Sequence, residues 1–360
     1  MNSAGTERSF LSFAEHIDFE KYDVELLLAS REGDFLKLVP PQIKISDMGA
    51  LGEIFKITKK NSFSVINKLF IRKNPFFAFV LLPDIIKMLQ GGLERTYAAN
   101  RIWMKLMKKM ERYPGEYDVA IAYWGDHTMF YMIDKINAAK KVTWLHFDYD
   151  EPPREDALYL PYFKKCDKII TVSSEIERAL TKKFSELSEI TETVENFVNE
   201  KDILKKAEEP CDYRDGFDGC AILSVGRICE QKGFDMAIPS VARLIGEGKN
   251  IRYYIIGSGE EEYKKKLRAL VVSLGVEKNV IFLPATDNPY KFMARCDVYL
   301  QPSRHEGKPI VVEEAKILGK KICATSYRSA YEQLSKTKNS VICEINEDGI
   351  YNGLKKIIEF

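Results

Sequence analysis

The sequence predicts an α/β fold in which two parallel-sheet domains face each other across a cleft. Short apolar runs rich in β-branched residues alternate with helix-like patterns over most of the chain, as in a parallel sheet covered by helices. A length of 360 residues suits two domains better than one core. We therefore expect an N-terminal domain at 1–198 and a C-terminal domain at 199–360, separated by a polar linker around 199–219. The last helix is free to return to the N-terminal domain.

The C-terminal half shows the clearer alternation of strands and helices. We expect its strands at 221–225, 253–256, 280–283, 298–301, 321–325 and 341–344, and its helices at 235–245, 260–274, 290–295 and 310–318.

The N-terminal half repeats this pattern around a helical insertion at 61–112. We expect its strands at 23–28, 42–45, 118–123, 141–145 and 168–172, and its helices at 6–16 and 174–183. A doubly wound sheet normally begins with a strand, whereas only five residues precede the first helix. We therefore expect an unpaired gap in the N-terminal sheet, and a natural start upstream of Met1.

Composition narrows the function classes. The 54 Lys and Arg residues nearly balance 53 Asp and Glu residues, so the net charge of +1 gives no argument for nucleic acid. The seven cysteines lack C-x-x-C spacing, which indicates reduced thiols. No secretory leader opens the chain, and its longest apolar run is far too short to cross a bilayer. We expect a soluble, cytoplasmic protein.

The loop at 301–310 has the composition of a ligand site. In an open parallel sheet, ligands bind beyond the carboxyl ends of the strands. Pro309 suits the first turn of the next helix, whose free N–H groups and positive dipole end can hold a pyrophosphate. Glu306 lies before this helix and Glu314 about one turn inside it, so both carboxylates can accept hydrogen bonds from sugar hydroxyls. The alternative for Glu313 and Glu314 is a solvated helix face.

Two further loops follow strands of the same domain. Gly226 and Arg227 come directly after a strand, and Lys232 precedes the next helix. Gly226 permits close backbone approach, while Arg227 and Lys232 offer two cations to phosphate oxygens. The loop Gly257-Ser258-Gly259 is short and open enough for a base or ribose to pack on it.

These motifs resemble those of the retaining glycosyltransferases of family 4, which have two Rossmann-like domains in the GT-B fold. The resemblance is most specific in the C-terminal half, where seven residues separate Glu306 from Glu314. The motifs that carry it follow in order: Gly5-Thr6-Glu7-Arg8, Trp144-Leu145-His146, Thr171-Val172-Ser173, Asn196-Phe197-Val198-Asn199, Val225-Gly226-Arg227 with Lys232-Gly233, Ile256-Gly257-Ser258-Gly259, and Ser303 with Glu306-Gly307 and Glu314.

The resemblance implies roles for the matching residues. Arg227 and Lys232 would bind the donor diphosphate and stabilise it as it leaves. Glu314 would hold the nucleotide ribose and Glu306 the donor sugar. Gly5 would approach the diphosphate from the opposite domain, and His146 would lie beside the transferred sugar. The other donor-binding positions would be Gly226, Gly257, Gly259, Gly307, Lys308, Pro309 and Ile310. The resemblance also implies that the anomeric configuration is retained.

Two positions depart from the family pattern. Ala4 stands where the first loop usually carries another glycine, which restricts how closely that loop reaches the phosphates. Lys308 replaces an aromatic or small residue, so we expect a third cation at the donor. Both departures affect the choice of donor.

The N-terminal half offers candidates for metal and acceptor contacts. Asp148-Tyr149-Asp150 has the D-x-D pattern of metal-dependent glycosyltransferases. We favour a solvated or acceptor-facing loop, because Arg and Lys already offset the diphosphate charge, and we expect no metal or other cofactor. His127 ends a strand at the cleft, and Asp126 either orients an acceptor hydroxyl or caps a helix. We predict Asp126, His127 and Asp148 as acceptor-side residues.

The insertion at 56–112 is basic and rich in aromatic residues. It carries thirteen Lys and Arg residues against three acids, with Phe63, Phe70, Phe76, Phe77, Phe79 and Trp103 interleaved. Such a patch suits the surface of an anionic membrane. The alternative is a set of ordinary helices whose aromatic side chains fill the core. We favour contact with the inner face of the cell membrane.

Together, these features predict an enzyme that moves a hexose-type sugar from a nucleotide diphosphate, with UDP favoured, to a glycan or lipid-linked glycan. The product would be a bacterial-type surface polysaccharide. The alternatives are a GT-B phosphorylase or epimerase, and a non-catalytic glycan-binding partner subunit. The presence of Arg227, Lys232, Glu306 and Glu314 argues against the partner subunit.

Overall fold

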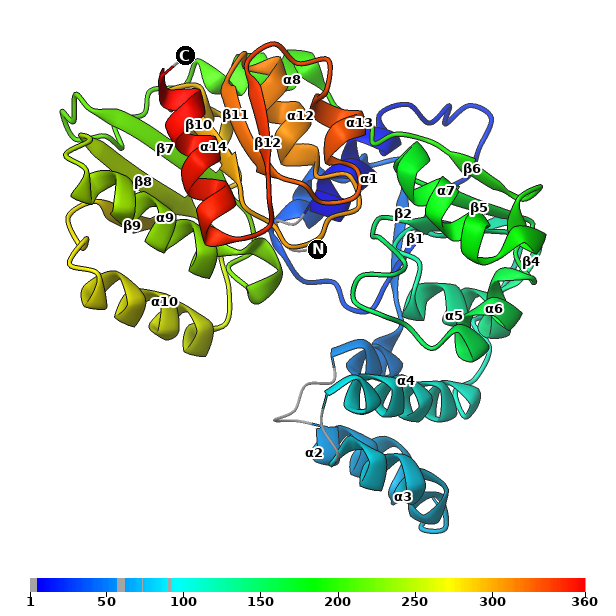
Figure 1. Cartoon of the computed structure of the whole chain (residues 1–360). Coiled ribbons are helices and arrows are strands. Elements are labelled where there is room, and N and C mark those ends of the chain that lie inside the picture. Colours follow the sequence, from blue (N-terminus) through cyan, green and yellow to red (C-terminus); the bar gives the residue numbers. More distant parts are fainter. Residues whose placement is uncertain (1–4, 57–61, 73, 90–91, 360) are drawn as a thin grey trace. The chain divides into compact units, whose positions relative to one another are not determined.

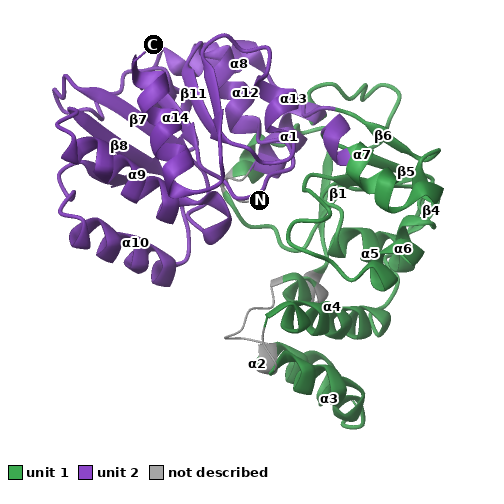
Figure 2. Cartoon of the chain, viewed as in Figure 1, with its two compact units in different colours: residues 1–2, 14–172, 177–194 green, residues 3–13, 173–176, 195–360 purple. Residues whose placement is uncertain are grey.

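The computed structural model describes residues 5–56, 62–72, 74–89 and 92–359 (Figure 1). The chain divides into two compact units, coloured in Figure 2. Unit 1 contains residues 1–2, 14–172 and 177–194, and unit 2 contains residues 3–13, 173–176 and 195–360. Two short segments from the N-terminal half, 3–13 and 173–176, therefore cluster with the C-terminal unit.

Unit 2 is built on a six-stranded parallel sheet with the strand order β12-β11-β10-β7-β8-β9. The predicted parallel α/β fold of this half is confirmed, and each predicted strand and helix is present within a few residues. The strands are β7 (Cys220–Val225), β8 (Ile251–Ile256), β9 (Val280–Leu283), β10 (Val298–Gln301), β11 (Lys321–Thr325) and β12 (Ser340–Cys343). The helices are α8 (Glu200–Ala207), α9 (Phe234–Gly246), α10 (Glu261–Ser273), α11 (Tyr290–Met293), α12 (Ile310–Ile317), α13 (Ala330–Leu334) and α14 (Glu347–Glu359), with a 3₁₀ turn η5 (Glu230–Lys232).

Helices cover both faces of this sheet, which explains why its strands read as continuous apolar runs. Ile222 of β7 belongs to a buried cluster with α9, α10 and α14. Its neighbours Ala221 and Leu223 point to the other face and join a cluster with α8, α11, α12 and α13. The core of unit 2 therefore consists of two apolar layers, one on each side of the sheet.

Two expectations for unit 2 are corrected. The stretch 199–219 is not simply a linker, because it begins with α8, whose N-cap Asn199 accepts a hydrogen bond from the Asp202 N–H at 2.9 Å. Ile203 of this helix is buried in the core of unit 2. The last helix, α14, does not return to the N-terminal domain, since its Ile350 and Leu354 are buried in the core of unit 2.

Unit 1 contains a four-stranded parallel sheet, β3-β4-β5-β6, and a separate parallel pair, β1-β2. The strands are β1 (Glu25–Leu28), β2 (Lys44–Asp47), β3 (Glu116–Ala122), β4 (Asn137–Leu145), β5 (Lys168–Thr171) and β6 (Thr191–Thr193). The helices outside the insertion are α5 (His127–Lys135), α6 (Asp156–Phe163) and α7 (Ser174–Lys183), with 3₁₀ turns η1 (Asp34–Leu38), η2 (Gly49–Lys56) and η4 (Ser185–Leu187). The sequence analysis did not predict α5, α6 or β6.

The expected gap in the N-terminal sheet is present among the described residues. β1 and β3 belong to different sheets, and no described strand pairs with both. β3 is therefore an edge strand of the four-stranded sheet, and its Val119 and Ile121 are 48% and 45% exposed. A side chain bridges the two sheets instead, because the Glu25 carboxylate accepts a hydrogen bond from the Tyr117 hydroxyl at 2.9 Å.

The insertion is helical, as predicted. It contains α2 (Ser62–Ile66), a π-helical turn η3 (Asn67–Ile71), α3 (Phe77–Met88) and α4 (Gly92–Lys108), and α3 packs beside α4 (Figure 1). Lys59, Lys60 and Lys73 lie outside the described residues. Across the described part of the chain, each helix is too short or too polar to cross a membrane.

Helix α1 (Gly5–Ala14) lies mostly in unit 2, although the sequence analysis assigned it to the N-terminal domain. Ser9 donates a hydrogen bond to the Asn196 side chain at 2.9 Å, and the Phe13 ring lies 5.6 Å from that of Phe197. The N-terminal helix thus contributes side chains to the unit that contains the strand-end loops.

Candidate functional site

The loops after β7 and β10 lie where the strand order of unit 2 reverses, since these two central strands are neighbours. Such a switch point is the usual ligand site of an open α/β sheet. The Arg304 N–H donates to the Gln231 carbonyl at 2.8 Å, and the Gln231 side chain donates to the His305 carbonyl at 3.0 Å. These hydrogen bonds join the two loops.

Gly233 is required where the loops meet. Its φ of 68° lies in the left-handed region, and a Cβ at this position would stand 2.0 Å from the Pro302 carbonyl oxygen. Because only glycine fits here, Lys232 comes next to the loop that carries Glu306.

The Glu306 carboxylate accepts three hydrogen bonds at one of its oxygens. Its Oε1 accepts from Lys232 Nζ at 2.6 Å, from Ser303 Oγ at 2.6 Å and from Gln301 Nε2 at 3.0 Å. Glu306 is 8% exposed. Burial, together with the Glu306 charge, also raises the pKa of Tyr327. Glu306 and Lys232 thus form a fixed ion pair beyond the carboxyl ends of the central strands β7 and β10.

Glu314 lies in α12 (Ile310–Ile317), about one turn after the helix begins, and is 1% exposed. Its Oε1 accepts from Arg8 Nη1 at 3.2 Å and from the Tyr290 hydroxyl at 3.0 Å. Its Oε2 is buried and has no hydrogen-bond partner among the described residues. Pro309 is the N-cap residue of this helix rather than part of its first turn.

Lys308 has partners other than the expected donor. The residue is 8% exposed, and its Nζ pairs with Glu195 at 2.7 Å and with Glu332 at 3.4 Å. Burial alone would raise the pKa of Glu332, but hydrogen bonds from Ser173 and from the N–H groups at the start of α7 lower it to about 2. Lys308 is therefore neutralised within unit 2.

The glycines after β7 and β8 permit two backbones to touch. A Cβ on Gly257 would lie 1.9 Å from the Gly226 carbonyl oxygen, and a Cβ on Gly259 would lie 2.1 Å from that of Ile228. Gly226 in turn lies under the Lys232 side chain, whose Cε would be 3.3 Å from an added Cβ. Arg227, between these loops, is exposed.

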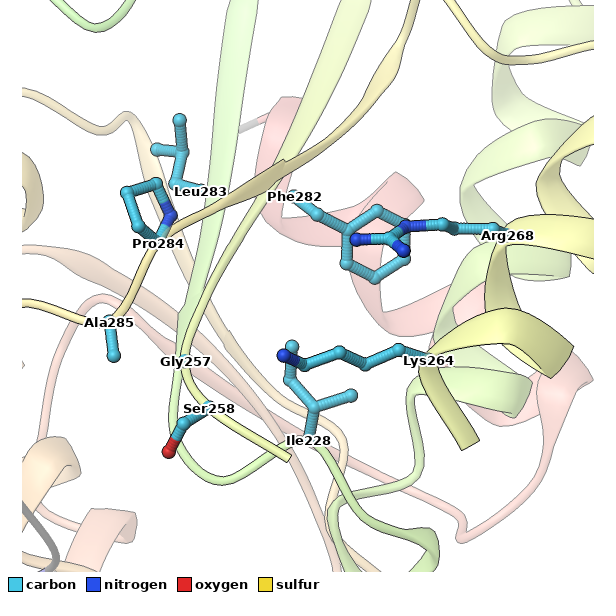
Figure 3. A pocket seen from close by; sticks show the side chains of 9 residues that line it. All are labelled: Ile228, Gly257, Ser258, Lys264, Arg268, Phe282, Leu283, Pro284 and Ala285. Atoms are coloured by element: carbon cyan, nitrogen blue, oxygen red, sulfur yellow. The ribbon is translucent and has the colours of Figure 1, made fainter. Parts of the chain in front are cut away.

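A pocket of about 370 Å³ adjoins these loops at the edge of the sheet (Figure 3). Gly257 and Ser258 line one side, and the Lys264 and Arg268 side chains of α10 point into it from another. The remaining lining residues are Ile228, Phe282, Leu283, Pro284 and Ala285. Sequence reasoning missed Lys264 and Arg268 because nothing in a surface helix distinguishes them from solvated cations.

Gly5, the first residue of α1, also belongs to unit 2 rather than to the opposite domain. A Cβ added to Gly5 would lie 3.6 Å from Ile310 Cγ2 at the start of α12. Ala4, the predicted departure from the family pattern, lies outside the described residues. Gly307 contributes its carbonyl oxygen, which accepts from Ser329 Oγ at 2.5 Å.

The acceptor-side candidates lie in unit 1 and have structural partners. Asp126 occupies the N-cap position of α5 without a capping bond, and its carboxylate accepts from the Tyr159 hydroxyl at 2.5 Å. His127 stacks on Trp103, with ring centroids 4.2 Å apart, and its Nε2 lies 3.2 Å from Asn100 Oδ1. Burial lowers the pKa of His127.

Asp148 and His146 follow β4. Asp148 is 3% exposed, and its Oδ1 accepts from the Asp150 N–H at 3.1 Å, while Asp150 pairs with Lys183 at 3.0 Å. Within the described ranges, no cluster of three or more His, Cys, Asp or Glu side chains could hold a metal ion. The His146 ring lies 4.7 Å from that of Tyr123 and 5.7 Å from that of Trp144.

Comparison with known proteins shows which family and which fold this chain resembles. Residues 218–359 match the family described as glycosyl transferases group 1. An uncharacterized glycosyltransferase of Haemophilus influenzae is 25% identical over 366 aligned positions, covering 99% of this chain and 87% of that protein. The crystal structure of Anabaena Alr3699/HepE in complex with UDP and glucose superposes with a TM-score of 0.65 and 17% identity, covering 99% of this chain and 87% of that one.

A third relative is similar over a shorter stretch. The N-acetylgalactosamine-N,N'-diacetylbacillosaminyl-diphospho-undecaprenol 4-alpha-N-acetylgalactosaminyltransferase of Campylobacter jejuni is 30% identical over 199 residues. This match covers 55% of the chain and 52% of the relative, so it spans about half the length of each protein. With the matches above, it supports two statements. The fold is GT-B, and the chain is a glycosyltransferase.

Proposed function

We propose that this glycosyltransferase is a retaining enzyme of family 4 that takes a hexose-type sugar from a UDP-sugar. The observation that carries the proposal is the ion pair between Lys232 and Glu306, 2.6 Å apart and nearly buried where the loops after β7 and β10 interlock. A cation and a hydroxyl-binding carboxylate in contact suit a ligand that has a diphosphate next to a sugar.

In the proposed reaction, the bond between the anomeric carbon and the diphosphate oxygen breaks while the acceptor hydroxyl oxygen bonds to that carbon on the same face. The proton of the hydroxyl passes to the departing diphosphate. Lys232 and Arg227 stabilise the charge that develops on this leaving group, and Glu306 holds the sugar. Glu314 binds the ribose. The family resemblance assigns His146 a position beside the transferred sugar.

The donor nucleotide is proposed from size and from relatives. A pocket of about 370 Å³ beside Gly257 and Ser258 is large enough for a nucleobase. Anabaena Alr3699/HepE, which shares the fold, was crystallised with UDP and glucose. Together these support a UDP-sugar as the donor.

The donor test uses thermal shifts with UDP-, GDP-, ADP- and dTDP-glucose. We expect UDP-glucose or another UDP-sugar to raise the melting temperature, and the Arg227→Ala variant to respond less. Arg252→Ala is the matched control, since Arg252 lies in the same unit over the Phe217 ring. The donor proposal is wrong if no nucleotide stabilises the enzyme, or if Arg227→Ala responds as the wild type does.

We further propose that the enzyme needs no metal ion, because Arg227 and Lys232 offset the diphosphate charge. Transfer should then proceed at an unchanged rate in excess EDTA. A rate that falls in EDTA and is restored by Mg²⁺ or Mn²⁺ would contradict this.

The proposed acceptor is a glycan or lipid-linked glycan of a surface polysaccharide, reached at the inner face of the cell membrane. The Campylobacter relative acts, by its name, on a diphospho-undecaprenol-linked sugar. Other relatives are named for lipopolysaccharide core biosynthesis and O-antigen biosynthesis. These names support a lipid-linked acceptor.

Helix α3 supports contact with a membrane. Its inner side packs Phe77 and Leu81 into the core, and the buried Asp84 pairs with Arg101 at 2.8 Å. Its outer side is also apolar. The exposed large residues on and around α3 are Phe76, Phe79, Val80, Leu82, Ile85, Ile86, Leu89 and Leu93. Several follow at intervals of three or four, which places them along one side of a helix.

Exposed cations of the insertion favour an anionic bilayer over a protein partner. Arg72, Lys87, Lys108 and Lys109 are exposed in the insertion, and each cation near an anionic surface contributes about 1 kcal/mol. Phe70 and Trp103, by contrast, are buried, so the structure divides the predicted aromatic patch between core and surface. Phe63 lies outside the described side chains.

Flotation with vesicles of phosphatidylcholine and phosphatidylglycerol tests this contact. The wild type should float with the vesicles, and the Phe76→Ser/Phe79→Ser double variant should not, with an unchanged melting temperature. Val272→Ser, at an exposed apolar residue of α10 outside the insertion, is the control. A wild type that stays unbound, or a double variant that floats equally, would refute the proposal.

A further inference from the structure

The two carboxylate oxygens of Glu314 have different surroundings. Oε1 accepts from both Arg8 Nη1 and the Tyr290 hydroxyl, at 3.2 and 3.0 Å. Oε2 is buried and meets no hydrogen-bond partner in the described part of the chain. A buried, unpaired acceptor is unfavourable unless a ligand supplies the donor. Oε2 is therefore the atom of Glu314 with capacity for a ligand hydroxyl.

Arg8 reaches Glu314 from the other end of the chain, on α1. Its Nη2 donates to the Asp287 carbonyl at 3.2 Å, and its guanidinium lies over the Tyr290 ring, 5.3 Å from the centroid. The side chain is 14% exposed. The two ends of the guanidinium thus hold different partners, which a lysine ammonium could not do in the same geometry.

We propose that Arg8 is a positioning residue for nucleotide binding, acting through Glu314. With Tyr290, it occupies Oε1 and fixes the carboxylate, so that Oε2 remains to accept a hydrogen bond from a ribose hydroxyl. The inference rests on the proposed function, which places the ribose at Glu314, and adds that α1 is part of the ribose site.

A purely structural role for Arg8 would tie α1 to unit 2 without affecting the ribose. The two roles predict different values for one ratio, the affinity for UDP divided by the affinity for an analogue that lacks a ribose hydroxyl. If Arg8 acts through Glu314, its loss should weaken only those ligands that have the ribose hydroxyl. If Arg8 only anchors α1, its loss should weaken all nucleotides alike.

The experiment measures the affinity of the full chain for UDP and for 2′-deoxy-UDP and 3′-deoxy-UDP by calorimetry. The wild type should bind UDP about tenfold or more tighter than at least one deoxy analogue, because a hydrogen bond to a charged group is lost. In Arg8→Met this ratio should fall toward one, while the affinity for that analogue changes little. Glu314→Gln should reduce the same ratio, and the double variant should add little to either change.

Two controls separate this effect from a loosened helix or a lost arginine. Ser9→Ala removes the hydrogen bond that ties α1 to Asn196 without touching Glu314. Arg243→Met removes an arginine of unit 2 that likewise lies over a tyrosine, Tyr351, and pairs with an acid, Asp348. Both should keep the wild-type ratio. If Arg8→Met does not fold, Arg8→Lys should fold and show a reduced ratio.

Failure of this inference is distinct from failure of the proposed function. If the wild type does not bind UDP, the proposed donor is wrong. If it binds UDP and discriminates against a deoxy analogue, but Arg8→Met keeps the ratio, only the inference is overturned. A wild type that binds UDP without any discrimination also overturns it, because Glu314 would then not hold the ribose.

Discussion

The strand-end loops of unit 2 and those of unit 1 use polar residues differently. In unit 2, Lys232 and Glu306 pair on a frame of interlocked loops, and Glu314 retains a buried oxygen with no partner among the described residues. In unit 1, Asp126 is held by Tyr159, and His127 stacks on Trp103 and contacts Asn100. Among these side chains, Glu314 in unit 2 retains a buried oxygen without a partner in the described part of the chain, whereas Asp126 and His127 in unit 1 are engaged in contacts within their own unit.

This difference teaches how a ligand site can be recognised. Lone polar residues at strand ends are common, and most find partners inside the protein. The candidate site of unit 2 combines close backbone packing with charged groups that two loops bring together. Gly233 and Gly257 provide that packing in unit 2, where a Cβ would stand 2.0 and 1.9 Å from a carbonyl oxygen.

The comparison predicts its largest contrast for one substitution in each unit. Lys232→Met should lower kcat by about 100- to 1,000-fold, because it removes a cation that stabilises the leaving diphosphate. Asp126→Asn should instead lower stability by about 1 kcal/mol, through its hydrogen bond with Tyr159. Steady-state kinetics and thermal unfolding of both variants separate these effects. A large loss of kcat in Asp126→Asn with normal stability would contradict this and support the predicted role of Asp126 in acceptor binding.

A second prediction concerns the interlocked loops. Gly233→Ala should destabilise the protein by about 2–4 kcal/mol and impair catalysis, because the new methyl group would overlap the Pro302 carbonyl oxygen. Gly275→Ala is the matched control, with nearly the same φ, 67° against 68°, but no atom within 4 Å of the added Cβ. It should cost about 1 kcal/mol. Equal melting temperatures for the two variants would show that the loop contact does not hold the site.

Much of unit 2 could be predicted from the sequence because its strands are buried on both faces. Ile222 and Leu223 face opposite layers, so β7 reads as an apolar run bounded by a glycine loop. The sequence analysis placed Lys232 and Glu306 in one ligand site, because their loops follow neighbouring strands, but it did not predict the ion pair that they form across 74 positions. The partners of Lys308 could not be predicted, because Glu195 and Glu332 lie far from it in the sequence.

Unit 1 was less predictable, for physical reasons that differ by residue. Helix α5 begins at His127, directly after Asp126. The positive φ of Asp126, 51°, could not be recognised from the sequence. Asp148 has the residue type of a metal ligand, yet it is buried and accepts a backbone hydrogen bond from Asp150. Arg8 belonged to a motif that the sequence analysis recognised, but a contact across 306 positions has no local signal.

An effect smaller than that of Gly233→Ala is predicted for Glu332, which accepts hydrogen bonds from Ser173 and the Glu175 N–H in the short segment that clusters with unit 2. The folded pKa of Glu332, about 2, lies below its ordinary value of 4.5. Its stabilisation should therefore be fully present above about pH 4.5 and be lost as the pH falls toward 2.

Glu332→Gln should lower stability at pH 7 by about 1–2 kcal/mol, which corresponds to roughly 2–8 °C for a unit of this size. The difference from the wild type should shrink at pH 3, because the carboxylate in the unfolded chain, with its ordinary pKa of 4.5, is then mostly protonated, while the folded one, with a pKa of about 2, is not. Glu261→Gln, at an exposed acid paired with Lys264, is the control and should leave the melting temperature unchanged at either pH. A deficit for Glu332→Gln that is equal at pH 7 and pH 3 would mean that the shape of the side chain, not its charge, holds residues 173–176 to unit 2.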